Sequence, residues 1–139
     1  MRILFDTKVI LDVLLDREPH ASAAAALMSQ VEVSKIQGFL CATTITTLYY
    51  LLAKTLGQKE AHRYIKILMA LFEIAPVNRV VIENALDNNF KDFEDAVLYE
   101  SAVHSNVEYI VTRNVKDFKS SKIPVFEPVE LNQIIENLK

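Results

Sequence analysis

Short apolar runs alternate along the chain with longer segments whose apolar residues recur at helical spacing. The apolar runs lie at 3–5, 39–42, 72–77, 109–112 and 124–126. The helical segments begin soon after Thr7 and then cover 21–33, 43–56, 58–71, 78–86, a stretch that starts at Asp92 and includes Val103, and 129–138. Uninterrupted apolar runs are typical of strands buried in a parallel sheet, and strands that alternate with helices favour right-handed crossovers. The pattern therefore predicts an α/β fold, a three-layer α/β/α sandwich with helices on both faces of a mostly parallel central sheet.

Polar residues and one glycine mark the predicted helix ends. Asn78 and Asp92 stand at the start of helical segments and are expected to cap them. Thr43 or Thr44 is expected to cap the start of the next helical segment. Gly57 is expected to end this segment, since glycine readily adopts the backbone conformation that terminates many helices. The 139 residues contain no credible linker and no repeat, so we expect residues 1–139 to form a single domain.

Composition narrows the classes of protein that fit. Apolar residues make up 51% of the chain and charged residues 24%, which is enough apolar surface for a buried core. No apolar run approaches the ~20 residues of a membrane span, and the apolar stretch before Asp6 is too short for a signal peptide. The single cysteine, Cys41, excludes an intramolecular disulfide and a cysteine-rich zinc site. We therefore expect a cytoplasmic protein without membrane contact. Its net charge of −3 argues against coating nucleic acid through bulk charge, but not against a nucleic-acid enzyme.

Acidic residues gather where the predicted strands end. Ligands bind beyond the carboxyl ends of the strands in open parallel sheets, so polar residues at those ends form the candidate site. These residues are Asp6 after the first strand, Arg113, Asn114 and Asp117 after the strand at 109–112, and Asp92, Glu94 and Asp95 at the start of the preceding helix. Carboxylates in one cleft repel one another unless a cation is bound, and they suit Mg²⁺ or Mn²⁺. The arrangement predicts a divalent metal site that activates water against a phosphodiester.

Each of these acids also has a simpler interpretation. Asp92 and Asp95 have the spacing of a helix cap and a first-turn acid, both of which the helix dipole favours. Asp6 could be a turn residue or the N-cap of the following helix, and Asp117 could be a loop acid. Asp12, inside the first predicted helix, is expected at the surface or behind the site rather than in it.

Four short motifs resemble those of PIN domains, in the same order along the chain. They are Asp-Thr-Lys-Val-Ile-Leu-Asp at 6–12, Thr-Thr-Leu-Tyr-Tyr at 46–50, Asp-Phe-Glu-Asp-Ala at 92–96 and Thr-Arg-Asn-Val-Lys-Asp-Phe at 112–118. The resemblance implies a Rossmann-like fold and a Mg²⁺- or Mn²⁺-dependent ribonuclease. Many small members are VapC-type toxins of toxin–antitoxin pairs, so it also implies an antitoxin partner and a homodimer. By position, Asp6 and Asp95 match the family's metal-binding acids, and Asp117, with Asn114, matches its C-terminal acidic region.

Two residues depart from the family's pattern. Lys8 stands where the family usually has asparagine, and Thr47 stands where it has its second acid. A neutral threonine hydroxyl is a poor ligand for Mg²⁺, so metal binding is weakened unless Asp92 or Glu94 replaces the missing acid. Two functions therefore stay open: a metal-dependent ribonuclease that acts on RNA, or a catalytically impaired PIN-like domain that binds RNA or protein.

The residues expected to act fall into two groups. Those that would be catalytic or hold the metal are Asp6, Asp95 and Asp117, together with Asn114 and Asp92. Those that would contact the phosphates of RNA are Lys8, Arg113 and Lys116. A solvated surface is the simpler interpretation of these bases.

Overall fold

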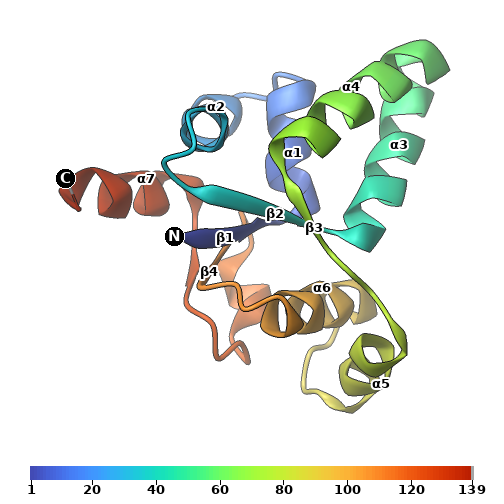
Figure 1. The fold of residues 1–139 in the computed structure, drawn as a ribbon, viewed down its shortest axis with the longest axis vertical. Helices are drawn as coiled ribbons and strands as arrows, with labels where there is room; N and C mark the ends of the chain where they lie inside the picture. The colour runs from blue at the N-terminus through green and yellow to red at the C-terminus, as the bar shows by residue number, and fades with distance from the viewer. Residues whose placement is uncertain (139) are drawn as a thin grey trace.

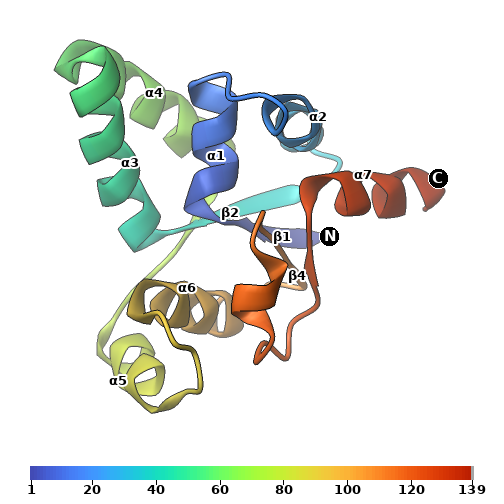
Figure 2. The ribbon, with the colours of Figure 1, turned by 180° about the vertical axis from the view of Figure 1, so that it is seen from behind.

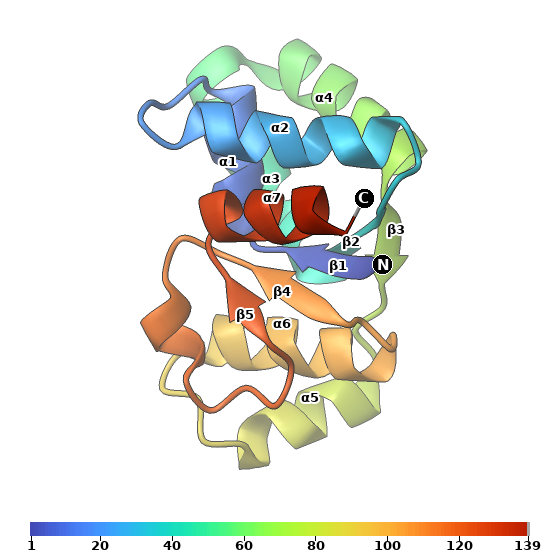
Figure 3. The same cartoon turned by 90° about the vertical axis from the view of Figure 1, so that its left-hand side faces the viewer.

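Five short strands pair in parallel in the computed structural model, which describes residues 1–138. They are β1 (Arg2–Phe5), β2 (Gln37–Cys41), β3 (Glu73–Ala75), β4 (Tyr109–Val111) and β5 (Val125–Phe126). Their order across the sheet is β3-β2-β1-β4-β5, visible in Figure 3. The central strand β1 pairs with β2 on one side and with β4 on the other. The strand order therefore reverses at β1, which is where open parallel sheets form their binding crevice.

Helices cover both faces of this sheet. They are α1 (Thr7–Leu14), α2 (Ala21–Glu32), α3 (Ala42–Leu56), α4 (Gln58–Leu71), α5 (Arg79–Asp87), α6 (Phe93–His104) and α7 (Pro128–Asn137). A single 3₁₀ turn, η1, spans Val115–Phe118. Figure 1 shows α5 and α6 on one face and the remaining helices on the other, which confirms the predicted three-layer sandwich. No helix within residues 1–138 combines the length and the apolar run that crossing a membrane requires.

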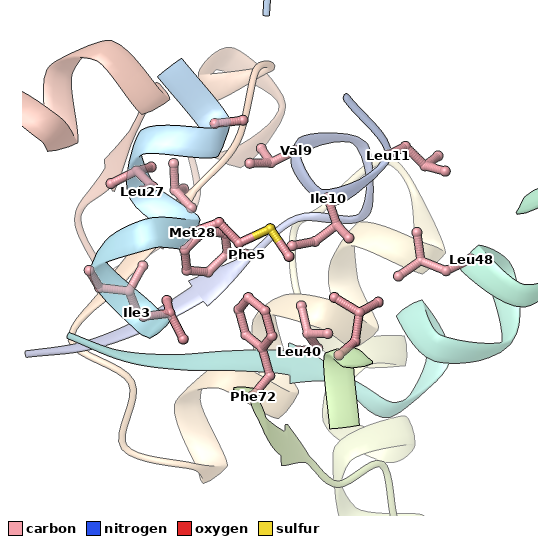
Figure 4. Close-up of a cluster of buried hydrophobic side chains, with 14 of the residues drawn as sticks. Ile3, Phe5, Val9, Ile10, Leu11, Leu27, Met28, Leu40, Leu48 and Phe72 are labelled. Atoms are coloured by element: carbon pink, nitrogen blue, oxygen red, sulfur yellow. The ribbon is translucent and has the colours of Figure 1, made fainter. Parts of the chain in front are cut away.

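Alternating side chains of β1 pack into two separate hydrophobic clusters, one on each face of the sheet. Ile3 and Phe5 join the cluster on the face of α1, α2, α3, α4 and α7, whereas Leu4 joins the cluster on the face of α5 and α6. All three side chains are fully buried, and each contributes about 1.5–3 kcal/mol through burial. Figure 4 shows the first cluster, in which the rings of Phe5 and Phe72 meet edge to face with centroids 5.2 Å apart. Packing on both faces fixes the position of β1 in the sheet, and therefore the position of Asp6, which follows the strand.

The strand predicted at 39–42 begins and ends earlier than expected. The structure places it at Gln37–Cys41, so Gly38 lies inside the strand. A Cβ atom at Gly38 would lie 2.6 Å from the Phe72 ring, so only glycine lets this ring pack against β2. The close approach of the Phe72 ring to the backbone of β2, rather than a turn, therefore explains why residue 38 is glycine.

Three predicted helix ends are confirmed. Asn78 Oδ1 accepts a hydrogen bond from Val81 N at 3.1 Å, and Asp92 Oδ1 accepts one from Asp95 N at 3.0 Å. Gly57 follows α3 with a φ of 95°, a conformation that favours glycine.

The predicted cap of α3 is wrong. Neither Thr43 nor Thr44 caps this helix, because it begins at Ala42, and Cys41 precedes it without any side-chain cap. The end of β2 passes directly into the helix. Thr44 is buried instead, and its hydroxyl bonds to that of Thr7 at 2.9 Å. This bond ties the start of α3 to the start of α1.

Candidate active site

A cleft of about 660 Å³ opens beyond the carboxyl ends of β1 and β4. Figure 2 shows the N-terminal ends of α1, α3 and α6 at one edge of the sheet, and residues at these ends line the cleft. The predicted site residues that line it are Asp6, Lys8, Asp92, Asp95, Arg113, Asn114 and Asp117. Segments more than 80 residues apart in sequence therefore meet at one edge, as the order of the strands requires.

Asp6 directly follows β1 and lines the cleft, and the predicted N-cap of α1 is confirmed. Its Oδ1 accepts from Thr7 N at 2.8 Å, and its Oδ2 accepts from the Thr112 hydroxyl at 2.8 Å. These two bonds fix the plane of the carboxylate. Burial raises the pKa of Asp6, and this effect outweighs the hydrogen bonds and the nearby charges of Lys8 and Arg113, which lower it.

Asp95 lies in the first turn of α6 and is half-buried. Burial is the largest cause that raises the pKa of Asp95 to about 7, followed by the negative charge of Asp6. Asp92, Asp117 and Glu94 add further repulsion. Carboxylates that follow β1, begin α6 and lie in η1 therefore repel Asp95 across one cleft. Such a cluster is the electrostatic environment that a divalent cation stabilises.

The donor set fits a hydrated cation rather than an ion enclosed by protein. Within residues 1–138, no three acidic, histidine or cysteine side chains stand close enough together to ligate one ion. Mg²⁺ normally takes only one or two carboxylates and keeps several waters for which substrate phosphates can substitute. Asp6 and Asp95 are the two carboxylates that could hold such an ion, and Asn114 and Asp117 line the same cleft.

Thr47 lines the cleft from α3, at the position where an acid was expected. Its hydroxyl donates to Glu94 Oε1 at 3.4 Å. Glu94, on the first turn of α6, therefore brings a carboxylate to the place that Thr47 leaves without charge. Asp92 also lines the cleft, and one of its oxygens caps α6.

The predicted phosphate contacts divide between two hollows. Lys8 and Arg113 line the cleft, and Lys8 is exposed. Lys116 lies instead in an adjoining groove of about 490 Å³, which shares Asp92, Asp95 and Asp117 with the cleft. The acids therefore form the boundary between the cleft and the groove, and basic residues lie in both.

Of the two places expected for Asp12, the surface is wrong, and the structure places this residue behind the site, against two arginines that line the cleft. Its side chain is only 1% exposed. Asp12 Oδ1 lies 3.0 Å from Arg17 Nε, and Asp12 Oδ2 lies 2.8 Å from Arg113 Nε. Burial of this charge is tolerated because two guanidinium groups face it.

The sequence interpretation missed the roles of two further residues, one in the cleft and one buried behind it. Arg17 lines the cleft although it lies in the loop that breaks the first helical segment. Thr112 is fully buried and orients Asp6 from the end of β4, 106 residues away. The available signal for Arg17 was an acid among the apolar positions of α1, since a buried carboxylate requires a cation nearby.

Comparison with known proteins assigns the family. The PIN domain model matches residues 2–116. The chain is 29% identical over 134 residues to Ribonuclease VapC1 of Aquifex aeolicus (strain VF5), covering 93% of this chain and 92% of that protein. The FitAcB structure from Neisseria gonorrhoeae is similar with a TM-score of 0.69, at 21% identity over 91% of this chain and 98% of that one. The structure of VapBC2 from Rickettsia felis bound to a promoter DNA fragment is similar with a TM-score of 0.67, at 14% identity over 91% of this chain and 98% of that one. The resemblance seen in the motifs is confirmed, and the chain belongs to the PIN domain family.

Proposed function

We propose that this protein is a ribonuclease that hydrolyses phosphodiester bonds of RNA with the help of Mg²⁺ or Mn²⁺. The observation that carries the proposal is the meeting of Asp6 and Asp95 in one cleft, where burial and neighbouring acids raise the pKa of Asp95 to about 7. A bound divalent cation would relieve that repulsion, lower the pKa of its water and offset charge on the phosphate. The family and the ribonuclease relative support this reaction class.

Asp6 and Asp95 are the residues that would hold the cation. Hydrogen bonds from Thr7 N and the Thr112 hydroxyl orient Asp6, and each of its oxygens keeps a free lone pair. Asp95 is held by the helix that Asp92 caps. Asn114 and Asp117, which line the same cleft, would act directly or through water.

Glu94 would supply the acid that the family places on its third helix. Its contact with Thr47 supports this substitution, because it puts a carboxylate beside α3 without an acidic residue on α3 itself. Lys8 and Arg113 would hold phosphate in the cleft, and Lys116 would hold it in the adjoining groove. Basic residues on both sides of the acids favour a bound strand that crosses the site.

The partners are part of the same proposal. Structural neighbours include VapBC2 from Rickettsia felis and a toxin–antitoxin complex from Klebsiella pneumoniae. We propose that this chain is the toxin of such a pair, that it acts in the cytoplasm and that it forms a homodimer. Co-expression with the product of the adjacent gene, followed by size-exclusion chromatography with light scattering, tests both the antitoxin and the dimer.

Cleavage of labelled RNAs of varied sequence and structure tests the enzyme. The expected result is cleavage that requires Mg²⁺ or Mn²⁺, stops with EDTA and is lost in Asp6→Ala. Absence of metal-dependent cleavage, or trace activity that survives Asp6→Ala, contradicts the proposal. Thr47 and Lys8 favour one alternative, an impaired PIN-like domain that binds RNA or protein, and retained RNA binding without cleavage would support it.

A further inference from the structure

We propose that Asp12, Arg17 and Arg113 form a binding site for an RNA phosphate, in which Asp12 is a positioning residue that presents both guanidinium groups to the cleft. The inference rests on the proposed ribonuclease function and adds Arg17 and Asp12 to its substrate contacts. Its ligand is a phosphate of the bound strand that lies beside the acidic residues rather than on them.

The geometry joins three segments. Asp12 lies in α1, Arg17 follows that helix, and Arg113 follows β4. The Nε atoms of Arg17 and Arg113 lie 3.0 Å and 2.8 Å from the two oxygens of Asp12, and a terminal nitrogen of Arg113 lies 3.4 Å from Oδ1. Arg17 therefore approaches the carboxylate through its Nε, whereas Arg113 approaches it through its Nε and donates a hydrogen bond from one terminal nitrogen. Both terminal nitrogens of Arg17 and the other one of Arg113 lie outside these contacts.

Both arginines are also partly open to solvent and line the cleft. The side chains of Arg17 and Arg113 are 42% and 26% exposed, whereas that of Asp12 is 1% exposed. A guanidinium group carries five N–H donors in a rigid fork that matches phosphate oxygens. The buried carboxylate of Asp12 thus contacts one side of each guanidinium group, and the remaining N–H donors are available at the cleft.

The charge of the cluster is larger than a structural tie requires. One carboxylate and two guanidinium groups leave a net charge of +1, whereas a single arginine would neutralise Asp12. The loop is also tied by its backbone, since Arg17 N donates to the Asp12 carbonyl oxygen at 2.9 Å. The surplus positive charge lies in the same cleft as Asp6 and Asp95, where a polyanion would otherwise meet mainly carboxylates.

Salt-dependent binding of a fluorescein-labelled single-stranded RNA, measured by anisotropy in EDTA, tests the site without cleavage. Arg17→Ala is expected to weaken binding about tenfold and to reduce the slope of log K against log[salt] by about 0.7, the value for one phosphate contact on a single strand. Arg17→Lys should keep the slope but recover only part of the affinity, because it retains the charge and loses the fork. The control is Arg79→Ala, since Arg79 is 87% exposed on α5 and pairs with Glu83.

A second variant tests the positioning role of Asp12. Asp12→Asn should weaken RNA binding, and the double variant with Arg17→Ala should bind no more weakly than the single variants, because both changes remove the same arrangement. In Mn²⁺, both single variants should raise KM more than they lower kcat. If Asp12→Asn fails to fold, Arg17→Ala still decides the question, since Arg17 lies in a partly exposed loop.

The outcomes separate this inference from the proposed function. If Arg17→Ala matches the wild type and Arg79→Ala in both affinity and salt slope, or if the wild type does not bind RNA, the phosphate site is overturned. If the wild type binds RNA through an Arg17-dependent salt slope but does not cleave it, the phosphate site stands and the ribonuclease proposal is overturned.

Discussion

The acids that line the cleft and Asp12, the acid buried behind it, have opposite electrostatic surroundings. Burial raises the pKa of both Asp6 and Asp95, and at Asp95 the neighbouring carboxylates raise it further. Asp12 is more deeply buried, yet two arginines contact its two oxygens. The acids of the cleft carry negative charge that raises the pKa of Asp95. The cluster around Asp12 carries one more positive charge than its carboxylate neutralises.

The difference indicates two complementary binding roles. A buried charge without a partner destabilises the folded state, so its presence indicates a ligand of opposite charge. The acids at the ends of β1 and α6 would take a cation, and the arginines around Asp12 would take an anion. Substitutions in the two groups should therefore change stability in opposite directions, and the following predictions test this contrast.

The largest expected effect is on catalysis at Asp6. Asp6→Asn should lower metal-dependent cleavage by at least about 100-fold, since even the loss of groups that only support metal ligands costs 10- to 100-fold. The amide keeps the volume and can still bond with Thr7 and Thr112, so circular dichroism should be unchanged. The matched control is Asp16→Asn, an exposed loop aspartate with a φ of 50°. Equal loss in both variants, or activity retained in Asp6→Asn, contradicts the assignment.

Removal of the compensated acid should have the largest effect on stability. Asp12→Ala leaves two arginines without their shared partner, and it should lower the free energy of unfolding by about 3 kcal/mol, the low end for breaking a buried ion pair. The partial exposure of Arg17 places the value at that end. Urea denaturation measures the change, with Asp16→Ala as the control. A change no larger than that of the control would show that the cluster does not tie α1 to β4.

Substitution of Glu94 should have an intermediate effect. If Glu94 replaces the missing acid of α3, Glu94→Gln should lower kcat/KM about tenfold, as expected for a group that supports a metal site. The double variant that adds Thr47→Glu should recover most of the activity, because the carboxylate returns from the other side of the 3.4 Å contact. Full activity of Glu94→Gln would mean that this acid has no part in the site.

The smallest effect should be a gain in stability at Asp95. Because its folded pKa is raised to about 7 from 3.8, the folded protein binds protons more tightly, and its stability falls as pH rises through this range. In EDTA, Asp95→Asn should therefore match the wild type below pH ~4 and exceed it above pH ~7 by about 1 kcal/mol, a value discounted for the half-exposed position of Asp95. Thermal unfolding across pH measures the difference. Lower stability of Asp95→Asn at high pH would contradict the repulsion.

Local sequence signals were sufficient to predict most of the fold and to place Asp6 and Asp95 at one edge of the sheet. The apolar runs at 3–5 and 109–112 specified the two central strands, because a parallel strand is buried on both faces. Asn78 and Asp92 identified helix starts through their side-chain chemistry. Asp6 and Asp95 followed from the rule that sites lie beyond carboxyl ends of strands, together with the motifs around them.

Other features depend on contacts between distant segments and were not predictable in the same way. The start of α3 has no capping side chain, so no residue type marks it. Asp12 and Arg17 are five residues apart, which is not the spacing of a helical ion pair, and Arg113 comes from another segment. The support of Asp6 by Thr112 likewise forms only when β4 pairs with β1.

Calorimetric titration with Mn²⁺ tests the central claim most directly, namely that Asp6 and Asp95 hold one divalent cation. The wild type should bind one Mn²⁺ per chain at millimolar or lower concentration, with protons released at pH 7, and Asp6→Asn and Asp95→Asn should lose this heat while Asp16→Asn keeps it. A wild type without binding heat at millimolar Mn²⁺, or an Asp6→Asn variant that binds Mn²⁺ as well as the wild type does, would contradict the account.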